Sequence, residues 1–392
     1  MLRLLIENIY PSKFRFVGTL MIVELKDVCE KEISNIRQKD LLDKKGDYPI
    51  YGASGLIGNV DFYRQETPYV AVVKDGAGIG RAMLLPAKSS VIGTMQYLIP
   101  KGNVLPEYLY YVVKNMHLEK YYSGATIPHI YFKYYKKEKF NLVDLDQQRK
   151  IISVFKKIED AIRKQRDELT NLDTLIKARF VEMFGDPIIN NKKLTEVPMT
   201  KICQIIDGDR GKNYPRAKDF KTNGYCLFLN AKNVTTTGFD FHKCIFISKE
   251  RDELLHNGRL NLGDIVLTTR GTIGNLALYT EKVPYNHLRI NSGMVILRMN
   301  HEKIIDKFFI EQFKMQLKKI KMKIASGSAQ PQLPVSTMSK IPIVLPSIRK
   351  QEKYSDFVKQ VDKSKVVNAS IMKYIISIRF YLYFKENKEG AR

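Results

Sequence analysis

The chain has 392 residues and a mass of 45.4 kDa, which is too long for one ordinary hydrophobic core and predicts two or more domains. Hydrophobic residues make up 44% of it and charged residues 27%, which excludes both a disordered chain and a membrane-spanning one. Sixty-five Lys and Arg against 41 Asp and Glu give a net charge of +24, an excess that attracts a polyanion. Nucleic acid is the first candidate and an anionic membrane surface the second.

Residues 1–20 mix apolar with charged side chains and contain no small-residue cleavage site, so they are not a signal peptide. We regard them as an N-terminal extension and expect the first domain to open at Met21 (MIVELKDVC). The four cysteines form no CxxC pair, and none has a His at zinc-ligand spacing. This usage predicts buried thiols in a reduced, cytoplasmic compartment and no metal site.

A long internal repeat then organises the chain. VELKDVC (23–29) matches VPMTKIC (197–203), DGAGIGRAMLL (75–85) matches TRGTIGNLALY (269–279), and YYSGATIPHIYF (121–132) matches IASGSAQPQLPV (324–335). The offset grows from 174 residues (29 to 203) to 194 (75 to 269) and 203 (121 to 324). Two copies of one fold give such growing offsets when the second copy has longer loops. Each copy is predicted to combine short strands and Gly-rich turns with a helix, near LPEYLYYVVKN and KFFIEQFKMQLKKI respectively.

Each copy is followed by a long helix whose apolar positions advance by steps of 4 and 3, as in a coiled coil. The first helix should end where Gly185 adopts a left-handed conformation and Pro187 stops the helix. The seam positions are Ile151, Phe155, Ile158, Ile162, Gln165, Leu169, Leu172 and Ile176 in the first helix, and Tyr354, Val358, Val361, Lys365, Asn368, Met372 and Ile375 in the second.

We expect the two helices to pair with each other in antiparallel fashion, because neither buries its apolar seam alone. Gln165 and Asn368 stand at the midpoints of the two spans, so they would face each other and set the register, unless each is merely a tolerated polar seam residue. The predicted fold is α+β, with two homologous mixed α/β domains held by an antiparallel coiled coil in a pseudo-twofold dumbbell. Its parts are the domains 21–146 and 187–347, the helices 147–186 and 348–385, and a tail 386–392.

Two homologous basic modules at a fixed separation suit duplex DNA, which repeats every ~34 Å. From residue 21 to about residue 385 the sequence resembles the DNA-specificity subunit of type I restriction-modification systems. The segments that carry the resemblance are YPIYGASGLIGNVDFY (48–63), DGAGIG, SGATIP, ARFVEMFGDP, SGSAQPQL and LPSIRKQ. The first module departs from the family pattern, because it closes with VDLDQQR instead of a proline-bearing segment, and residues 1–20 have no counterpart.

The resemblance implies that each domain is a target recognition domain that reads one half of a bipartite, asymmetric site in double-stranded DNA. It implies that the helices set the spacing between the half-sites and dock two methyltransferase subunits, and that motor-nuclease subunits join for restriction. The chain itself would then be no enzyme and hold no cofactor, while S-adenosylmethionine, ATP and magnesium would serve the partner subunits.

Two alternatives stay open. AVVKDGAGIGR is similar to the glycine loop of an S-adenosylmethionine-dependent DNA methyltransferase, although its duplicate TTRGTIGNL lacks Gly76 and Gly78, and no NPPY or DPPY tetrapeptide follows. The second alternative is an orphan coiled-coil DNA-binding protein.

Candidate DNA contacts follow from side-chain chemistry, since Arg and Lys suit guanine edges and phosphates whereas Asn and Gln suit adenine edges. They are Lys74, Arg81 and His129 in the first copy, and Asn230, Lys232, Asn233, Arg270, Asn275, Gln330 and Gln332 in the second. We expect the shared Gly80 and Gly274 to mark a tight strand turn beside them. The aromatic run 131–137 either stacks on bases or is ordinary strand sequence.

The charge excess is divided unevenly between the copies. Residues 187–347 hold 25 basic and 13 acidic residues, whereas residues 21–146 hold 17 and 15. Salt is therefore expected to weaken the DNA contacts of the second module more steeply than those of the first.

Overall fold

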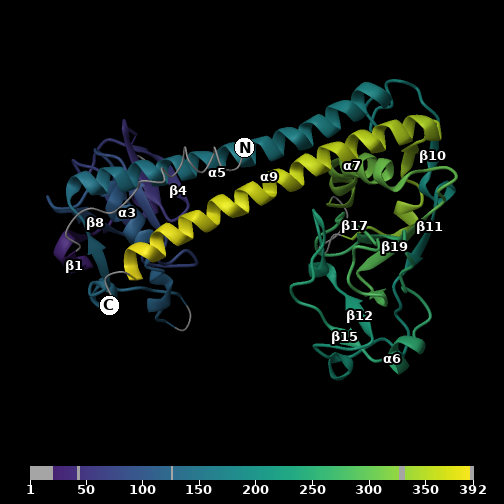
Figure 1. Cartoon of the computed structure of the whole chain (residues 1–392), viewed down its shortest axis with the longest axis horizontal. Coiled ribbons are helices and arrows are strands. Elements are labelled where there is room, and N and C mark those ends of the chain that lie inside the picture. Colours follow the sequence, from purple (N-terminus) through teal and green to yellow (C-terminus); the bar gives the residue numbers. More distant parts are fainter. Residues whose placement is uncertain (1–20, 42–44, 125–126, 326–331, 389–392) are drawn as a thin grey trace. The chain divides into compact units, whose positions relative to one another are not determined.

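The computed structural model describes residues 21–41, 45–124, 127–325 and 332–388 (Figure 1). The chain divides into unit 1, residues 1–167 with 369–392, and unit 2, residues 168–368, which are described separately. Two long helices, α5 (Leu145–Phe184) and α9 (Ile348–Lys388), contribute to both units. No helix within the described ranges combines the length and the apolarity that crossing a bilayer requires.

Unit 1 is a mixed α/β domain. Its strands are β1 (Met21–Glu24), β2 (Cys29–Ile33), β3 (Tyr48–Gly52), β4 (Gly55–Val60), β5 (Tyr69–Val73), β6 (Ala82–Leu85), β7 (Ser90–Val91), β8 (Met95–Pro100) and β9 (Lys139–Leu142). Its short helices are α2 (Leu25–Val28), α3 (Pro106–Asn115) and α4 (Phe132–Tyr135), with 3-10 turns at Gln38–Leu41 and Leu118–Tyr121. The strands form sheets in the orders β2-β8-β5-β6, β4-β3-β7 and β1-β9.

Strand β5 is the centre of the unit 1 core, and all five of its residues are buried. Because side chains alternate across a strand, Val70 and Val72 face the cluster that contains α3, while Tyr69, Ala71 and Val73 face a second cluster on the other side. A helix thus covers one face of the sheet and the β3 region covers the other, which explains a continuous apolar run where one-sided burial would give alternation.

Unit 2 has the same plan. Its strands are β10 (Glu196–Pro198), β11 (Cys203–Asp207), β12 (Cys226–Leu229), β13 (Val234–Thr235), β14 (Gly238–Phe239), β15 (Phe246–Ile247), β16 (Ile265–Thr268), β17 (Leu276–Leu278), β18 (Leu288–Ile290), β19 (Met294–Met299) and β20 (Pro342–Val344). Its helices are α6 (Lys249–Glu253), α7 (Asp306–Ala325) and α8 (Val335–Met338), with 3-10 turns at Met199–Lys201, Ala217–Asp219 and Ala231–Asn233.

The sheet orders confirm the duplication. In unit 2 they are β11-β19-β16-β17, β15-β12-β18 and β10-β20, and these correspond strand for strand to the three sheets of unit 1. Even the parallel pair recurs, since β3 runs parallel to β7 and β12 runs parallel to β18. The additional hairpin β13-β14 lies in the longer loops of the second copy.

Two matched side chains repeat their hydrogen bonds in both units. The buried amide of Gln148 accepts from the N–H of Leu105 and donates to the carbonyls of Asn103 and Val143. In the second copy, Gln351 accepts from the N–H of Ile305 and donates to the carbonyls of Lys303 and Pro346.

The matched thiols behave alike as well. Cys29 and Cys203 each donate to the carbonyl four residues earlier, and burial raises the pKa of both thiols to about 12. Cys226 is buried too, and Cys244 is partly exposed. The expectation of buried, unpaired thiols is thus confirmed for three of the four cysteines.

The long helices pair with each other inside each unit. In unit 1, Val154, Ile158 and Ile162 of α5 pack with Ile371 and Ile375 of α9. In unit 2 the end of α5 meets the beginning of α9, where the predicted seam residues Ile176, Tyr354, Val358 and Val361 share one core with Phe180 and Phe184. The early part of one helix therefore meets the late part of the other, which is antiparallel pairing.

Two details of the helices differ from the prediction. Helix α5 begins at Leu145 and ends at Phe184, two residues earlier at each end than predicted, and the carboxylate of Asp144 accepts from the N–H of Gln147 at its start. The buried seam residue after Asn368 is Ile371, 5% exposed, whereas the predicted Met372 is half-buried. Gly185 has the expected left-handed conformation (φ +80°), so its predicted role as the residue that stops α5 is confirmed, although the last helical residue is Phe184.

Gln165 lies in unit 1 and Asn368 lies in unit 2, each close to the boundary between the units in the sequence. Oε1 of Gln165 and Nδ2 of Asn368 are buried and have no hydrogen-bond partner among the described residues. Their contact with each other, and the dumbbell arrangement of the units, stay predictions.

Candidate nucleic-acid interface

The turn after β5 places the first-copy candidates. The N–H groups of Lys74 and Asp75 both donate to the carbonyl of Thr94, and the carbonyl of Lys74 accepts from the N–H of Ile130. His129 pairs with Asp75 as an isolated antiparallel bridge. Backbone hydrogen bonds thus join three segments that are distant in the sequence.

The turn after β16 repeats this frame in the second copy. The N–H groups of Thr269 and Arg270 donate to the carbonyl of Gly293, and the carbonyl of Thr269 accepts from the N–H of Leu333. Arg270 pairs with Gln332 as an isolated bridge. Asp75 and Arg270 therefore occupy equivalent positions, one residue away from the sequence match of Asp75 with Thr269, and His129 and Gln332 are equivalent as well. We call each set of backbone hydrogen bonds a recognition turn.

Both recognition turns depend on the shared glycine. Gly80 and Gly274 have φ values of +82° and +92°, and their N–H groups donate to the carbonyls of Val73 and Thr268. A Cβ atom on Gly80 would come within 2.5 Å of the backbone nitrogen of Glu119. The predicted tight strand turn is confirmed in both copies.

The side chains on the two recognition turns are chemically different. In the first copy, Oδ2 of Asp75 lies 2.6 Å from Nζ of Lys74, and its Oδ1 lies 2.6 Å from Nδ1 of His129. In the second copy, Arg270 and Gln332 are both exposed. The first turn thus presents a linked acid, base and imidazole, whereas the second presents a guanidinium and an amide.

An aromatic and cationic group stands beside the first recognition turn. Tyr131 and Tyr134 are each 50% exposed, and Nζ of Lys133 lies 5.5 Å and 4.8 Å from their ring centroids. The Tyr131 ring also stacks on His129, with 6.2 Å between centroids. Tyr131 directly precedes α4 and Tyr134 lies within it, so these two exposed rings are surface aromatics and not strand aromatics of the core.

The remaining first-copy candidate, Arg81, lies at the end of the same turn. Its side chain is exposed, and its Nη1 donates to the carbonyl of Ala53 at 3.0 Å. It stays a candidate contact.

Four second-copy candidates lie around the 3-10 turn Ala231–Asn233, where the structure corrects the interpretation of the amides. Asn233 is 1% exposed and donates to the carbonyls of Asp240 and Lys243. The side chain of Asn230 accepts from the N–H of Lys232.

Asn275 donates to the carbonyl of Val234. The three amides Asn230, Asn233 and Asn275 therefore hold backbone together, and Asn233 leaves the set of candidate contacts because it is buried. Lys232 is exposed and remains in the set. Gln330 lies outside the described residues.

Sequence reasoning missed Arg210. Its side chain is 51% exposed and lines a cavity of about 190 Å³ together with Arg270 and Gln332, and its Nη2 lies 3.0 Å from Oδ2 of Asp207. The only signal was the basic, Gly-containing loop GDRGK, which has no match in the first copy.

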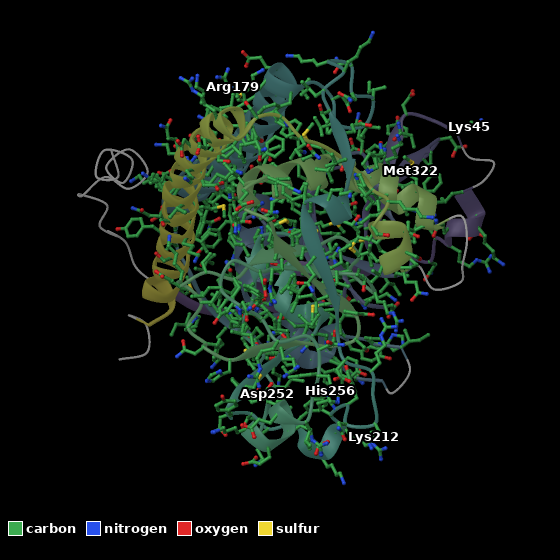
Figure 2. All side chains as sticks on the ribbon, turned by 90° about the vertical axis from the view of Figure 1, so that its right-hand side faces the viewer. Lys45, Arg179, Lys212, Asp252, His256 and Met322 are labelled. Carbon is green, nitrogen blue, oxygen red and sulfur yellow. The ribbon has the colours of Figure 1, made fainter. Side chains whose placement is uncertain are left out.

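The neighbouring Asp209 holds that loop. It is 8% exposed, its Oδ1 accepts from the N–H of Gly211, and its Oδ2 accepts from the N–H of His256. Figure 2 labels Lys212 in this loop and His256, whose N–H donates to Asp209. Burial alone would raise the pKa of Asp209, but the hydrogen bonds from these backbone amides outweigh burial and lower it.

Comparison with known proteins agrees with the internal repeat. A family model described as "Type I restriction modification DNA specificity domain" matches residues 18–171 and again residues 191–373. The type I restriction enzyme MjaVIII specificity subunit of Methanocaldococcus jannaschii is 24% identical over 318 residues, which are 75% of this chain and 72% of the relative. The MjaIX specificity subunit of the same organism is 24% identical over 153 residues, 35% of each chain.

Two solved structures share the fold. The S subunit of the type I restriction-modification system from M. genitalium superposes with a TM-score of 0.56 at 15% identity, covering 96% of this chain and 98% of its own. A structure described in terms of complex assembly and conformational transition of the type I R-M system also gives 0.56, at 13% identity, covering 96% and 99%.

Proposed function

The chain belongs to the type I restriction-modification DNA specificity family, and from this we propose that each of its two globular domains reads one half of a bipartite, asymmetric DNA site. The family match covers both copies of the repeat, which supports two readers in one chain. The charge of +24 supports an anionic ligand.

One observation carries this proposal: the two recognition turns have the same backbone hydrogen bonds and different side chains. The equivalent positions hold Asp75 in one copy and Arg270 in the other, and His129 in one copy and Gln332 in the other. Two domains with the same backbone at this turn would bind a duplex in the same orientation, whereas their different side chains would select different bases. An asymmetric site follows.

In the second domain, the exposed guanidinium of Arg270 would donate to O6 and N7 of guanine or to a phosphate. In the first domain, Asp75 would hold the His129 ring through Nδ1, so that Nε2 is directed away from the carboxylate. Tyr131 and Tyr134 would add a stacking surface beside it, and Lys133 would contact a phosphate.

The paired helices would set the distance between the half-sites and dock two methyltransferase subunits, with motor-nuclease subunits joining for restriction. On this proposal the chain catalyses nothing itself, and S-adenosylmethionine, ATP and magnesium are bound by those partners. The antiparallel pairing of the helices within each unit supports a ruler, because two helices packed along a heptad seam bend less than one helix alone.

The decisive experiment is to map methylated bases in a host that expresses this chain together with its methyltransferase subunit. We expect adenine methylation at one split motif with a spacer of constant length. Methylation by this chain alone would favour the methyltransferase alternative. DNA binding without association with a methyltransferase subunit would favour the orphan DNA-binding alternative.

A further inference from the structure

Unit 2 contains a cavity that none of the candidate DNA contacts lines. Its volume is about 330 Å³, and it lies between the loop after α5, the middle of α7, and α8 with the strand that follows. Its apolar wall includes Ile188, Ile320 and Ile341. Ile188 is 37% exposed, and the adjacent Ile189 is 72% exposed. Large apolar side chains exposed near such a cavity are typical of a surface that binds another protein.

A buried amide oxygen in this cavity has no partner. Gln316 is 5% exposed, and its Nε2 donates to the carbonyls of Pro187 at 3.0 Å and Pro342 at 2.9 Å. Its Oε1 is buried and accepts no hydrogen bond from the residues that the structure describes. A buried acceptor in that state destabilises the protein until a donor reaches it.

Gln312, one helical turn before Gln316, shows why Oε1 of Gln316 receives no hydrogen bond from the neighbouring strand. With its amide oriented to satisfy both groups, Gln312 donates to the carbonyl of Val344 and accepts from the N–H of Val344, each at 3.0 Å. Gln316 faces Pro342 on the same strand, and proline has no N–H. The strand can therefore supply an acceptor to Gln316 but no donor.

The rim of the cavity is cationic. Lys319 and Lys340 both line it and are exposed, and no carboxylate in the described ranges forms an ion pair with either. Nζ of Lys319 lies 3.4 Å from the carbonyl of Ile188. An occupant with a carboxylate would complement these two charges.

The first copy is built differently at this place. Leu105 and Ile305 are equivalent, because each donates its N–H to the buried glutamine of its own copy. Eleven residues on from each (105 to 116, 305 to 316) stand Met116, which caps α3, and Gln316, which lies inside α7. The buried Oε1 of Gln316 and the exposed Lys319, both on α7, are thus features of the second copy.

We propose that this groove binds one extended segment of a subunit that assembles with this chain. The segment is apolar, carries an Asp or Glu that pairs with Lys319 and Lys340, and donates a backbone N–H to Oε1 of Gln316. One such segment binds per chain, because the groove belongs to the second copy. The inference rests on the proposed function, since it takes the occupant from the assembled complex.

The test uses the full chain reconstituted with its methyltransferase and motor-nuclease subunits, and with benzoylphenylalanine in place of Thr337, an exposed residue of the cavity wall. After irradiation, mass spectrometry should find one partner segment that contains an Asp or Glu among apolar residues. The double variant Lys319→Glu/Lys340→Glu should reduce the yield of this cross-link about tenfold or more.

The matched control is Lys318→Glu/Lys321→Glu, which makes the same change of charge with exposed lysines of α7 that do not line the cavity. It should leave the yield within about twofold, because it changes only long-range attraction. Equal losses in the two double variants would overturn the proposal, as would a cross-link only to residues 1–20 or 326–331 of the chain itself. A complex that methylates a split motif but gives no cross-link refutes the groove alone, whereas absence of split-motif methylation refutes the proposed function.

Discussion

Asp75 and Arg270 stand at the same backbone position in the two copies and carry opposite charges. Around Asp75, the ammonium of Lys74 and the imidazole of His129 lie within hydrogen-bond distance, whereas the exposed Arg270 lines a cavity together with Arg210. On the proposed function, the guanidinium of Arg270, which forms no ion pair within the described part of the chain, would offer a row of donors to a base edge. The first domain instead carries the ion pair of Lys74 and Asp75, in which the two charges offset each other.

We predict that Arg270→Ala weakens recognition of the half-site read by unit 2 by about 1–3 kcal/mol, which is about 5- to 150-fold in affinity. The loss follows because the guanidinium would be a bidentate partner of one base. Methylome sequencing should show that specificity relaxes at one position or that methylation is lost. Gel filtration should show the complex still assembled.

Arg270→Lys is the control for that variant, because lysine retains the charge and loses the planar pair of donors. It should keep most of the phosphate attraction and still lose discrimination between bases. Unchanged methylation of every site in the alanine variant would contradict the assignment of Arg270.

We predict that Asp209→Asn loosens the loop that carries Arg210. The amide keeps an acceptor for the N–H of Gly211 but turns an NH₂ group towards the N–H of His256, which should cost about 1–3 kcal/mol. Because the chain has no Trp, urea unfolding is best followed by far-UV circular dichroism. A variant as stable as the parent chain at pH 7 would disprove the role of Asp209.

The same group predicts a pH dependence. The folded-state pKa of Asp209 is lowered, so its contribution to stability is full above the unfolded value near 3.9 and disappears as pH falls through the lower folded value. The difference in stability between the parent chain and Asp209→Asn should therefore shrink below about pH 4. A constant difference down to pH 2 would argue against an ionised Asp209.

At the scale of single residues, the sequence predicted the turns better than the contacts. Gly80 and Gly274 were identifiable because their positive φ leaves few alternatives to glycine. The structural role of Asn233 was not identifiable, because the sequence does not distinguish an asparagine that donates to two backbone carbonyls from one that contacts a base. Arg210 escaped because strand pairing brings it to Arg270 from 60 residues away (210 to 270).

Among the elements, α5 and α9 were predictable in their length and pairing, since heptad spacing depends on local sequence alone. The place where the seam shifts was less predictable. Ile371 is buried and Met372 is half-buried, although both are apolar and one residue apart. Packing against Ile158 and Ile162 decides between them, and that contact is not local in the sequence.

We predict that removing one heptad from both helices, residues 165–171 and 363–369, shortens the spacer of the DNA site by about three base pairs. Seven helical residues span about 10 Å, and ten base pairs span about 34 Å. The deletions leave intact the two seam clusters around Ile158 and Ile176. The spacer should be read from the methylated motif of the variant.

Deleting residues 165–171 alone is the control, because it shifts the seam of α5 against that of α9. This variant should fail to assemble or lose methylation, whereas the double deletion should retain both. An unchanged motif with full activity in the double deletion would refute the ruler.

For the whole molecule, the duplication explains why the fold could be predicted from one sequence. Each copy supports the other, so weak matches such as Cys29 with Cys203 gain weight from their growing offset. The length of α7 was not predictable in this way, because twenty residues have only ten helical counterparts in α3. The repeat therefore predicts the features that the two copies share, but not the features, such as the length of α7, in which they differ.

We predict that salt weakens DNA binding by unit 2 more steeply than binding by unit 1. Residues 187–347 have 25 basic and 13 acidic residues, against 17 and 15 in residues 21–146. Each additional phosphate contact adds about 0.9 to the slope of log K against log salt concentration. Titrating the full chain with short duplexes that carry a single half-site should give slopes that differ by about two or more. Equal slopes would show that the excess charge of unit 2 does not contact DNA.

The hydrogen bonds of the recognition turns join main-chain atoms, such as the N–H of Arg270 and the carbonyl of Gly293. Exchange of the side chain at position 75, 129, 270 or 332 would leave these bonds in place, so on the proposed function a new base preference would arise by substitution at little cost in folding. The two copies can also diversify independently. If each can adopt a given number of preferences, the number of accessible sites grows as the square of that number, which gives a lineage a large repertoire from few mutations.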